Sequence, residues 1–198
     1  PDTEARTLGH PGKRRRKALA RLLRDGLVER AEVIRDTVYR VNPDRRITLE
    51  YYKNSALHLC ANASFLAIAI GALGKDRFTA GELGADFRFL LYLLRYEFVL
   101  DPEADELEIE TQGLRQLEAA GAIAALADGG WTVLGWERLR DVAALTTNFL
   151  ESYHVVLKAL FQLRMKNVPE KQLAKEAQKV GRQLLEMGDI KRPESLSL

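Results

Sequence analysis

The amino-acid sequence predicts a mainly α-helical fold, a helical bundle that carries two small β-hairpins. Apolar residues recur every three or four positions over long stretches, and glycine or proline follows most of them, which predicts helices with defined ends. Two short apolar stretches fold back at polar or glycine-rich positions, which predicts the hairpins. We expect the 198 residues to form three parts: a basic helix and hairpin over 1–45, a helical domain over 46–190, and a tail over 191–198.

The first part begins with a basic helix. Residues 13–25 place three leucines on one helical face, and Gly26 supplies the stop. Residues 27–42 then alternate apolar and polar side chains around an Arg-Asp turn, which predicts a hairpin closed by Pro43.

An uncharged run follows, because no Asp, Glu, Lys or Arg occurs between Lys53 and Lys75. A membrane helix needs about 20 predominantly apolar residues, so the length permits a span. However, the first half of the run is rich in Asn, Ser and His, which are costly in hydrocarbon unless they are paired. We therefore predict one long buried helix over 47–73, with an interfacial helix as the alternative.

The middle of the chain predicts two more helices and the second hairpin. Helical spacing of leucine and phenylalanine over 78–99 predicts an amphipathic helix. An acidic helix over 103–120 follows, with Leu107 expected on its apolar face. An Asp-Gly-Gly turn then predicts a hairpin over 122–134.

The last part predicts two long helices. Apolar residues step by three and four over 136–165 and again up to Met187, the spacing of a bundle seam. Because the connector near Pro169 is short, we expect the two helices to pack antiparallel. The same seams allow a homodimer, so a helical dimerisation module is one alternative function.

The two hairpins share a layout, since each follows a short helix and a glycine. This helix-and-hairpin pair is winged-helix-like, and it makes a winged-helix DNA-binding protein a second alternative. The basic helix favours that alternative, whereas the eight acids against one base between Glu97 and Glu118 would repel phosphate. We do not expect nucleic acid as the partner.

The basic helix is the best candidate for contact with a membrane surface or with phosphate groups. Between Lys13 and Lys53 the chain carries thirteen Lys or Arg and six Asp or Glu, although the net charge of the whole is only +2. Such a cluster attracts anionic lipid headgroups. The candidate residues are Lys13, Arg14, Arg15, Arg16, Lys17, Arg21 and Arg24.

Residues of the kinds that carry catalysis or bind metals are sparse. Cys60 is the single cysteine and lies in an apolar stretch, so we expect a structural role and no disulfide. The three histidines form no metal-ligand pair, and no phosphate-binding or nucleophile motif occurs. We expect no metal site, no cofactor and no catalytic residue in this chain.

One stretch resembles a known family. "VYRVNPDRRITLEYYKNSALHLCANASFLAIAI" is similar to the segment downstream of the catalytic domain in the membrane-associated glycerol-3-phosphate acyltransferases, which include the dihydroxyacetone-phosphate acyltransferases. The stretches "FLLYLLRYEFVL" and "LRQLEAAGAI" extend the resemblance, which spans roughly residues 38 to 187. The family motif is matched by Tyr51, Tyr52, Lys53, Asn54 and His58, which we expect to be structural.

The resemblance implies a non-catalytic C-terminal domain. The family uses His-x4-Asp as its catalytic signature, but Arg15, Ala63 and Ala159 stand five places after the three histidines. We therefore expect the parent protein to carry the catalytic domain and to transfer an acyl group to glycerol 3-phosphate, the first step of phospholipid synthesis. The resemblance also implies that the catalytic domain and an anionic membrane surface are the partners, at the cytoplasmic face of the cell membrane.

Overall fold

The computed structural model describes two compact units, Pro1–Ala56 and Leu57–Leu198. We call them unit 1 and unit 2. The residues that the structure describes are 11–33, 36–45, 48–49, 56–98, 105–164 and 167–196.

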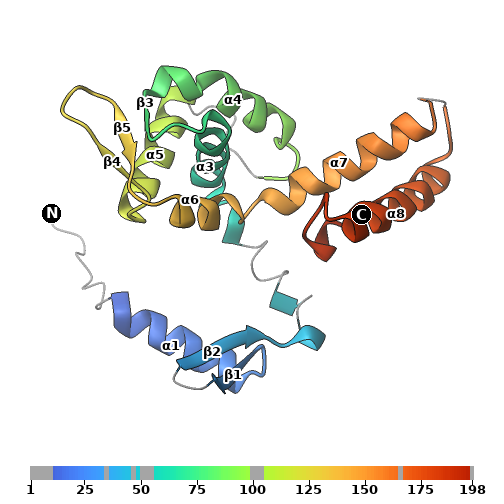
Figure 1. Ribbon diagram of the computed structural model, residues 1–198, viewed down its shortest axis with the longest axis horizontal. Helices are drawn as coiled ribbons and strands as arrows, with labels where there is room; N and C mark the ends of the chain where they lie inside the picture. The colour runs from blue at the N-terminus through green and yellow to red at the C-terminus, as the bar shows by residue number, and fades with distance from the viewer. Residues whose placement is uncertain are drawn as a thin grey trace, which may run out of the picture. The chain divides into compact units, whose positions relative to one another are not determined.

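The described part of unit 1 includes the predicted basic helix and the predicted hairpin (Figure 1). Helix α1 spans Pro11–Arg24, and strands β1 (Val28–Val33) and β2 (Asp36–Val41) pair antiparallel. Asp36 pairs with Val33, so it belongs to strand β2 and not to the turn in which the sequence suggested it; Ile34 and Arg35 lie outside the described residues. A short 3-10 helix, Pro43–Arg45, follows β2.

Most of unit 2 has the topology of a winged-helix module. Its elements run helix, strand, helix, helix, strand, strand, and the sheet order is β3-β5-β4. Strand β3 was not predicted, and it adds a third strand to the predicted hairpin. The bounds are α3 Ala61–Leu73, β3 Arg77–Phe78, α4 Ala80–Leu93, α5 Glu106–Ala119, β4 Ile123–Ala125 and β5 Trp131–Val133.

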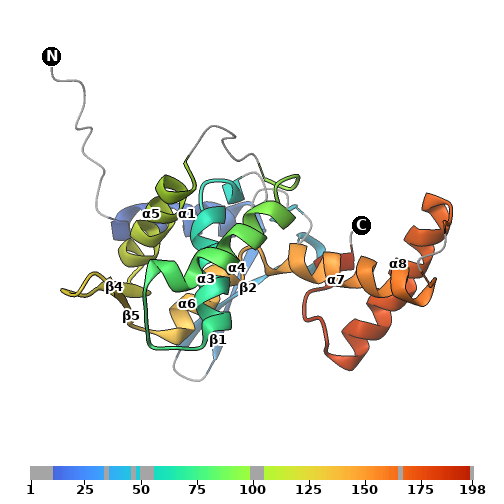
Figure 2. The same ribbon diagram turned by 90° about the horizontal axis from the view of Figure 1, so that it is seen from above.

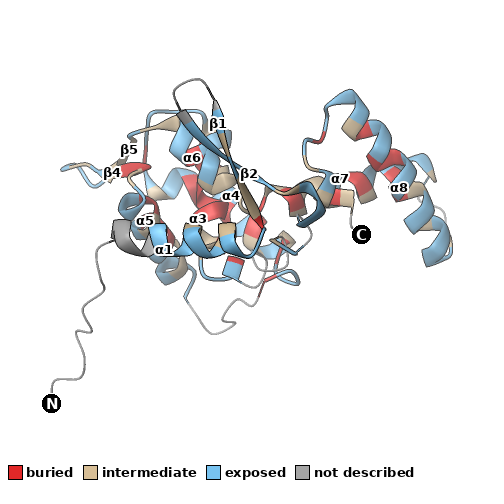
Figure 3. Ribbon diagram, turned by 90° about the horizontal axis from the view of Figure 1, so that it is seen from below, coloured by how far each residue is buried: buried red, intermediate tan, exposed pale blue. Residues whose placement is uncertain are grey.

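Helix α3 is the centre of this module and contacts α4, α5 and α6 (Figures 1 and 2). The buried helix predicted from the uncharged run is therefore present. It begins only at Ala61, however, because a turn at 58–60 interrupts the expected helix over 47–73. Figure 3 shows how the buried residues gather on α3.

The neighbours of α3 fit it closely. Gly113 of α5 lies against Asn62 and Leu66, where any side chain would collide. Phe98 stacks edge-on against Phe65 and Phe149, with ring centroids 5.5 and 5.0 Å apart. Leu107, expected on the apolar face of α5, is instead exposed.

The long helix predicted over 136–165 is wrong, because it divides into α6 (Trp136–Ala143) and α7 (Thr147–Gln162). Side-chain hydroxyls compete for the backbone at the break: Thr147 Oγ1 donates to the carbonyl of Ala143 at 2.8 Å. Apolar spacing continues across the break, so periodicity alone could not locate it.

Helix α7 packs against α8 (Glu170–Met187), as the seams predicted (Figure 1). The residues of α7 that are buried against α8 are Val155 and Ala159, whereas Met187, the last residue of the predicted seam, is exposed. A 3-10 helix, Pro193–Leu196, returns to α7 within the segment that we expected to be a tail.

Candidate membrane-facing and partner-facing surfaces

Helix α1 presents a basic face, which we define as Lys17, Arg21 and Arg24. These side chains recur at helical spacing and are all exposed. Arg16 is exposed as well, whereas the side chains of Lys13, Arg14 and Arg15 lie outside the described part of the chain.

The charge of the basic face is only weakly compensated within the helix. Asp25 lies 3.7 Å from Arg21 and 3.1 Å from Arg24, and both arginine side chains remain about three-quarters exposed. Exposed ion pairs of this kind contribute little free energy and are screened by salt. The face therefore keeps a net positive charge for an anionic surface.

The family-motif residues are only partly described. Tyr51, Tyr52, Lys53 and Asn54 lie outside the described residues. His58 lies in the turn before α3, where its side chain is exposed, and its structural role stays a prediction.

The C-terminal end of α4 carries an exposed aromatic and arginine cluster that the sequence did not reveal. Arg95 lies 3.8 Å from the ring centroid of Tyr92 and 4.5 Å from that of Tyr96, and its Nη2 donates to the Tyr96 hydroxyl at 3.0 Å. We call these three residues the Tyr-Arg-Tyr stack. The hydrogen bond with Arg95 lowers the pKa of Tyr92. Phe89 extends the exposed aromatic surface.

This stack has the composition of a surface that meets a membrane boundary or another protein. Tyrosine and arginine each combine an apolar body with a polar end, which suits the headgroup region of a bilayer and the centre of a protein interface. The sequence did carry one signal for this stack. Tyr92 and Tyr96 are four residues apart, at positions that differ from those of the buried Leu90 and Leu94.

A second exposed apolar surface lies on α7. Leu157 and Phe161 are exposed and line a shallow hollow with His154, Lys158 and Gln162. His154 is exposed on this surface.

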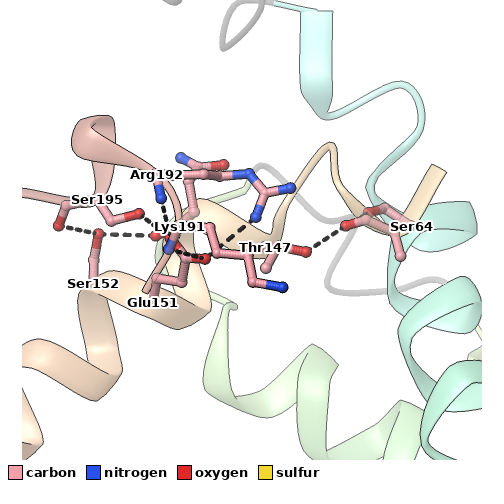
Figure 4. A network of polar contacts seen from close by, with 9 residues as sticks. Ser64, Thr147, Glu151, Ser152, Lys191, Arg192 and Ser195 are labelled. Carbon is pink, nitrogen blue, oxygen red and sulfur yellow. Dashed lines mark hydrogen bonds and ion pairs between the residues drawn. The ribbon is translucent and has the colours of Figure 1, made fainter. Parts of the chain in front are cut away.

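One polar side chain of unit 2, Glu151, has several partners and a structural role. Glu151 of α7 accepts hydrogen bonds from the backbone N–H groups of Lys191 and Arg192 and from the Ser195 hydroxyl, the last at 2.7 Å (Figure 4). Arg192 also forms an ion pair with Glu151 at 3.3 Å, and both side chains are mostly buried. This arrangement, which we call the Glu151 clasp, holds the C-terminal segment on α7.

The described residues contain no group of three His, Cys, Asp or Glu side chains that is placed to hold a metal ion. Burial raises the pKa of Cys60, which disfavours the reactive thiolate. No helix within the described ranges has both the length and the apolar character needed to cross a bilayer.

Comparison with known proteins identified one matching family. The family model for the glycerol-3-phosphate acyltransferase C-terminal region matches residues 4–198. Among curated proteins, no sequence matches the chain.

Proposed function

Because the chain belongs to the family of the glycerol-3-phosphate acyltransferase C-terminal region, we propose that it is the non-catalytic part of an enzyme that acylates glycerol 3-phosphate. The acyl donor is a thioester such as acyl-CoA or acyl carrier protein, and the product enters phospholipid synthesis. The match over residues 4–198 is the observation that carries this proposal.

The catalytic base of that reaction lies outside this chain in our proposal. Removing a proton from the acceptor hydroxyl needs a base that a second group orients, and none of the three histidines is followed by an aspartate five places on. Buried polar groups of unit 2 serve structural contacts instead. Ser64 and Thr146 stabilise the junction of α6 and α7, and Glu151 holds the C-terminal segment.

We also propose that this part helps to seat the enzyme on the cytoplasmic surface of the membrane. The basic face of α1 and the Tyr-Arg-Tyr stack support peripheral association, because cationic and amphipathic side chains favour anionic headgroups. The basic face belongs to unit 1 and the Tyr-Arg-Tyr stack to unit 2. Each surface could contact lipid independently, so the proposal requires no fixed placement of the two units.

The test is an acyl-transfer assay on the full polypeptide that contains these residues, in membranes, with glycerol 3-phosphate as acceptor. We expect transfer by the full polypeptide and none by residues 1–198 alone. Absence of transfer from both acyl-CoA and acyl carrier protein in the full polypeptide would overturn the proposal. A parallel assay with dihydroxyacetone phosphate identifies the acceptor.

Nucleic-acid binding is the competing function, and the topology of unit 2 is the observation that favours it. In a winged-helix protein the third helix enters the DNA groove, and here that position is taken by α5. Helix α5 carries Glu106, Glu108, Glu110 and Glu118 against the single base Arg115, so it would repel the phosphate backbone. Salt-dependent binding to duplex DNA would favour this alternative.

A further inference from the structure

Unit 1 repeats a local structure that is found in unit 2. After α1 and after α5, a glycine takes a left-handed conformation: φ is 66° at Gly26 and 69° at Gly121. The amide of the next residue, Leu27 or Ala122, donates to the carbonyl five residues back, at 2.9 and 3.0 Å. Both helices therefore end in the same capping motif.

The hairpins that follow also correspond. The amide of Asn42 donates to the Leu27 carbonyl at 3.1 Å, and the amide of Leu134 donates to the Ala122 carbonyl at 2.9 Å. In each unit, the residue directly after the capping glycine therefore accepts a backbone hydrogen bond from the residue that follows the second strand.

These bonds fix which residues correspond. Val41 pairs with the first residue of β1, as Val133 pairs with the first residue of β4. Two positions earlier, Tyr39 of β2 corresponds to Trp131 of β5. Alternate residues of a strand lie on one face of the sheet, and residues opposite each other on neighbouring strands share that face. Tyr39 and Val41 therefore lie on the face that corresponds to the inner face of the unit 2 sheet.

In unit 2 this face is covered. Trp131 and Val133 pack against the core built around α3. The outer edge of β5 is also occupied, because the Val133 amide donates to the Asp76 carbonyl at 2.8 Å and Phe78 of β3 pairs with Trp131. Strand β3, which occupies this edge, belongs to the helix–strand–helix segment α3-β3-α4, and residues of α3 and α4 form part of the core that covers the face.

In the described residues of unit 1, that cover is missing. Tyr39 and Val41 are 44% and 46% exposed. Among the residues described in this unit, only β1 and β2 belong to the sheet. The alternation of an antiparallel ladder turns the amide of Val41 away from β1, toward the outer edge of β2. Unit 1 thus presents an apolar face and a strand edge side by side.

We propose that unit 1 is completed by a helix–strand–helix segment of the acyltransferase polypeptide that lies outside these 198 residues. The segment adds a short strand to the edge of β2, with its carbonyl accepting from Val41 and an apolar residue opposite Tyr39. Its helices cover the leucine face of α1. This inference rests on the proposed function, because that function supplies the rest of the polypeptide.

A second copy of this chain fits the surface less well. The face to be covered includes one side of α1, a helix whose described side chains include Arg16 and the basic face. Pairing two such surfaces would bring like charges together, which disfavours association. The described part of unit 1 also offers no free helix–strand–helix segment that could be exchanged.

The chain offers a matched pair of variants for the test. Val41 and Val38 are the same residue type on the same strand, exposed by 46% and 45%, but on opposite faces of the sheet. We would compare Val41→Asp with Val38→Asp in the full polypeptide and in residues 1–198, and measure hydrogen exchange of the β2 amides by mass spectrometry.

In the full polypeptide, we expect the amides of β2 to exchange at least tenfold more slowly than in residues 1–198. Val41→Asp should remove this protection, and Val38→Asp should leave it. Equal exchange in the two unsubstituted proteins, or equal loss in both variants, would overturn the proposal. Protection that appears in residues 1–198 alone and increases with concentration would also overturn it, in favour of a second copy.

The exchange measurement is independent of activity, so the two proposals fail separately. Acyl transfer with an unprotected β2 would overturn the docking proposal and leave the function in place. Protection that is lost only in Val41→Asp, without acyl transfer to glycerol 3-phosphate, would support docking and overturn the function.

Discussion

The hydroxyl oxygens of Ser64 and Thr146 lie 2.7 Å apart, and both residues are fully buried. Ser64 Oγ also lies 2.9 Å from the carbonyl oxygen of Val142 and 3.3 Å from that of Ala143, in the last turn of α6. A single serine on the central helix thus connects α3 to the point where α6 ends and α7 begins.

The first prediction concerns this contact. Ser64→Ala should lower the free energy of unfolding by about 1–3 kcal/mol, because it leaves buried acceptors without their donor. Thr146→Val should also destabilise, and the double variant should cost less than the sum of the two. Urea denaturation of the three variants and the unsubstituted protein gives the interaction free energy between Ser64 and Thr146. Additive effects would contradict a direct hydrogen bond.

The second prediction concerns the close approach of α5 to α3. A Cβ at Gly113 would lie 2.5 Å from Leu66 Cδ1 and 3.2 Å from backbone atoms of Asn62. Gly113→Ala should therefore destabilise the protein by about 1–3 kcal/mol through overpacking.

Gly84 is the control for that substitution, because it lies within α4 and has nothing within 4 Å of its added Cβ. Gly84→Ala should stabilise by about 0.5–1 kcal/mol, as expected for a helix interior. Thermal unfolding of both variants checks the pair, and equal shifts in Tm would contradict the packing described here.

The third prediction concerns the Glu151 clasp. Glu151→Ala removes the acceptor for two backbone amides and one hydroxyl, so residues 191–196 should detach from α7. We expect a local cost of about 2 kcal/mol, measured as faster hydrogen exchange in that segment. Glu186→Ala, on the exposed side of α8, is the control and should leave the exchange unchanged.

The fourth prediction tests membrane association. Vesicles containing phosphatidylglycerol should sediment the chain at low salt. Replacing Lys17, Arg21 and Arg24 together by glutamate should weaken partitioning by about 100-fold or more, since each basic residue contributes about 1 kcal/mol near headgroups. Reversal of Lys171, Lys175 and Arg182 on α8 changes the net charge equally and is the control. Equal release by both sets would mean that net charge, and not the basic face, holds the chain on lipid.

The fifth prediction uses the single cysteine as a probe. Burial raises the pKa of Cys60, and its thiol contacts the carbonyl oxygen of Leu57 at 3.5 Å. Only the thiolate reacts with iodoacetamide, so alkylation at pH 8 should be slower than for free cysteine and should still increase above pH 9. A rate that reaches its plateau below pH 8 would show that the thiol pKa is lowered, contrary to this environment.

The sequence predicted the two hairpins and most helices because their signals are local. Gly26 and Gly121 mark helix ends by their left-handed conformation, and alternation marks the strands. Strand β3 was missed because two residues, Arg77 and Phe78, are too few to show a period. Its pairing depends on β5, which lies more than fifty residues away.

The candidate surfaces could be predicted only in part. The basic face of α1 follows from composition, since seven basic residues occur within one helix. The Tyr-Arg-Tyr stack does not, because a tyrosine at helical spacing has the same signal whether it faces a core or solvent. Tyr92 and Tyr96 are exposed because other residues of their segment pack against the core, and His58 is exposed in the turn at 58–60. Both outcomes depend on tertiary packing.

Helix α7 belongs to two separate cores. Phe149 and Tyr153 pack with the cluster around α3, while Val155 and Ala159 pack with α8 in a second cluster. Two separate cores can unfold as two cooperative units, and α7 is the continuous helix that contributes to both. The pair of α8 and the last half of α7 can therefore open while the winged-helix module stays folded. The Glu151 clasp sets how readily this happens, since it closes the pair at the end nearest the module.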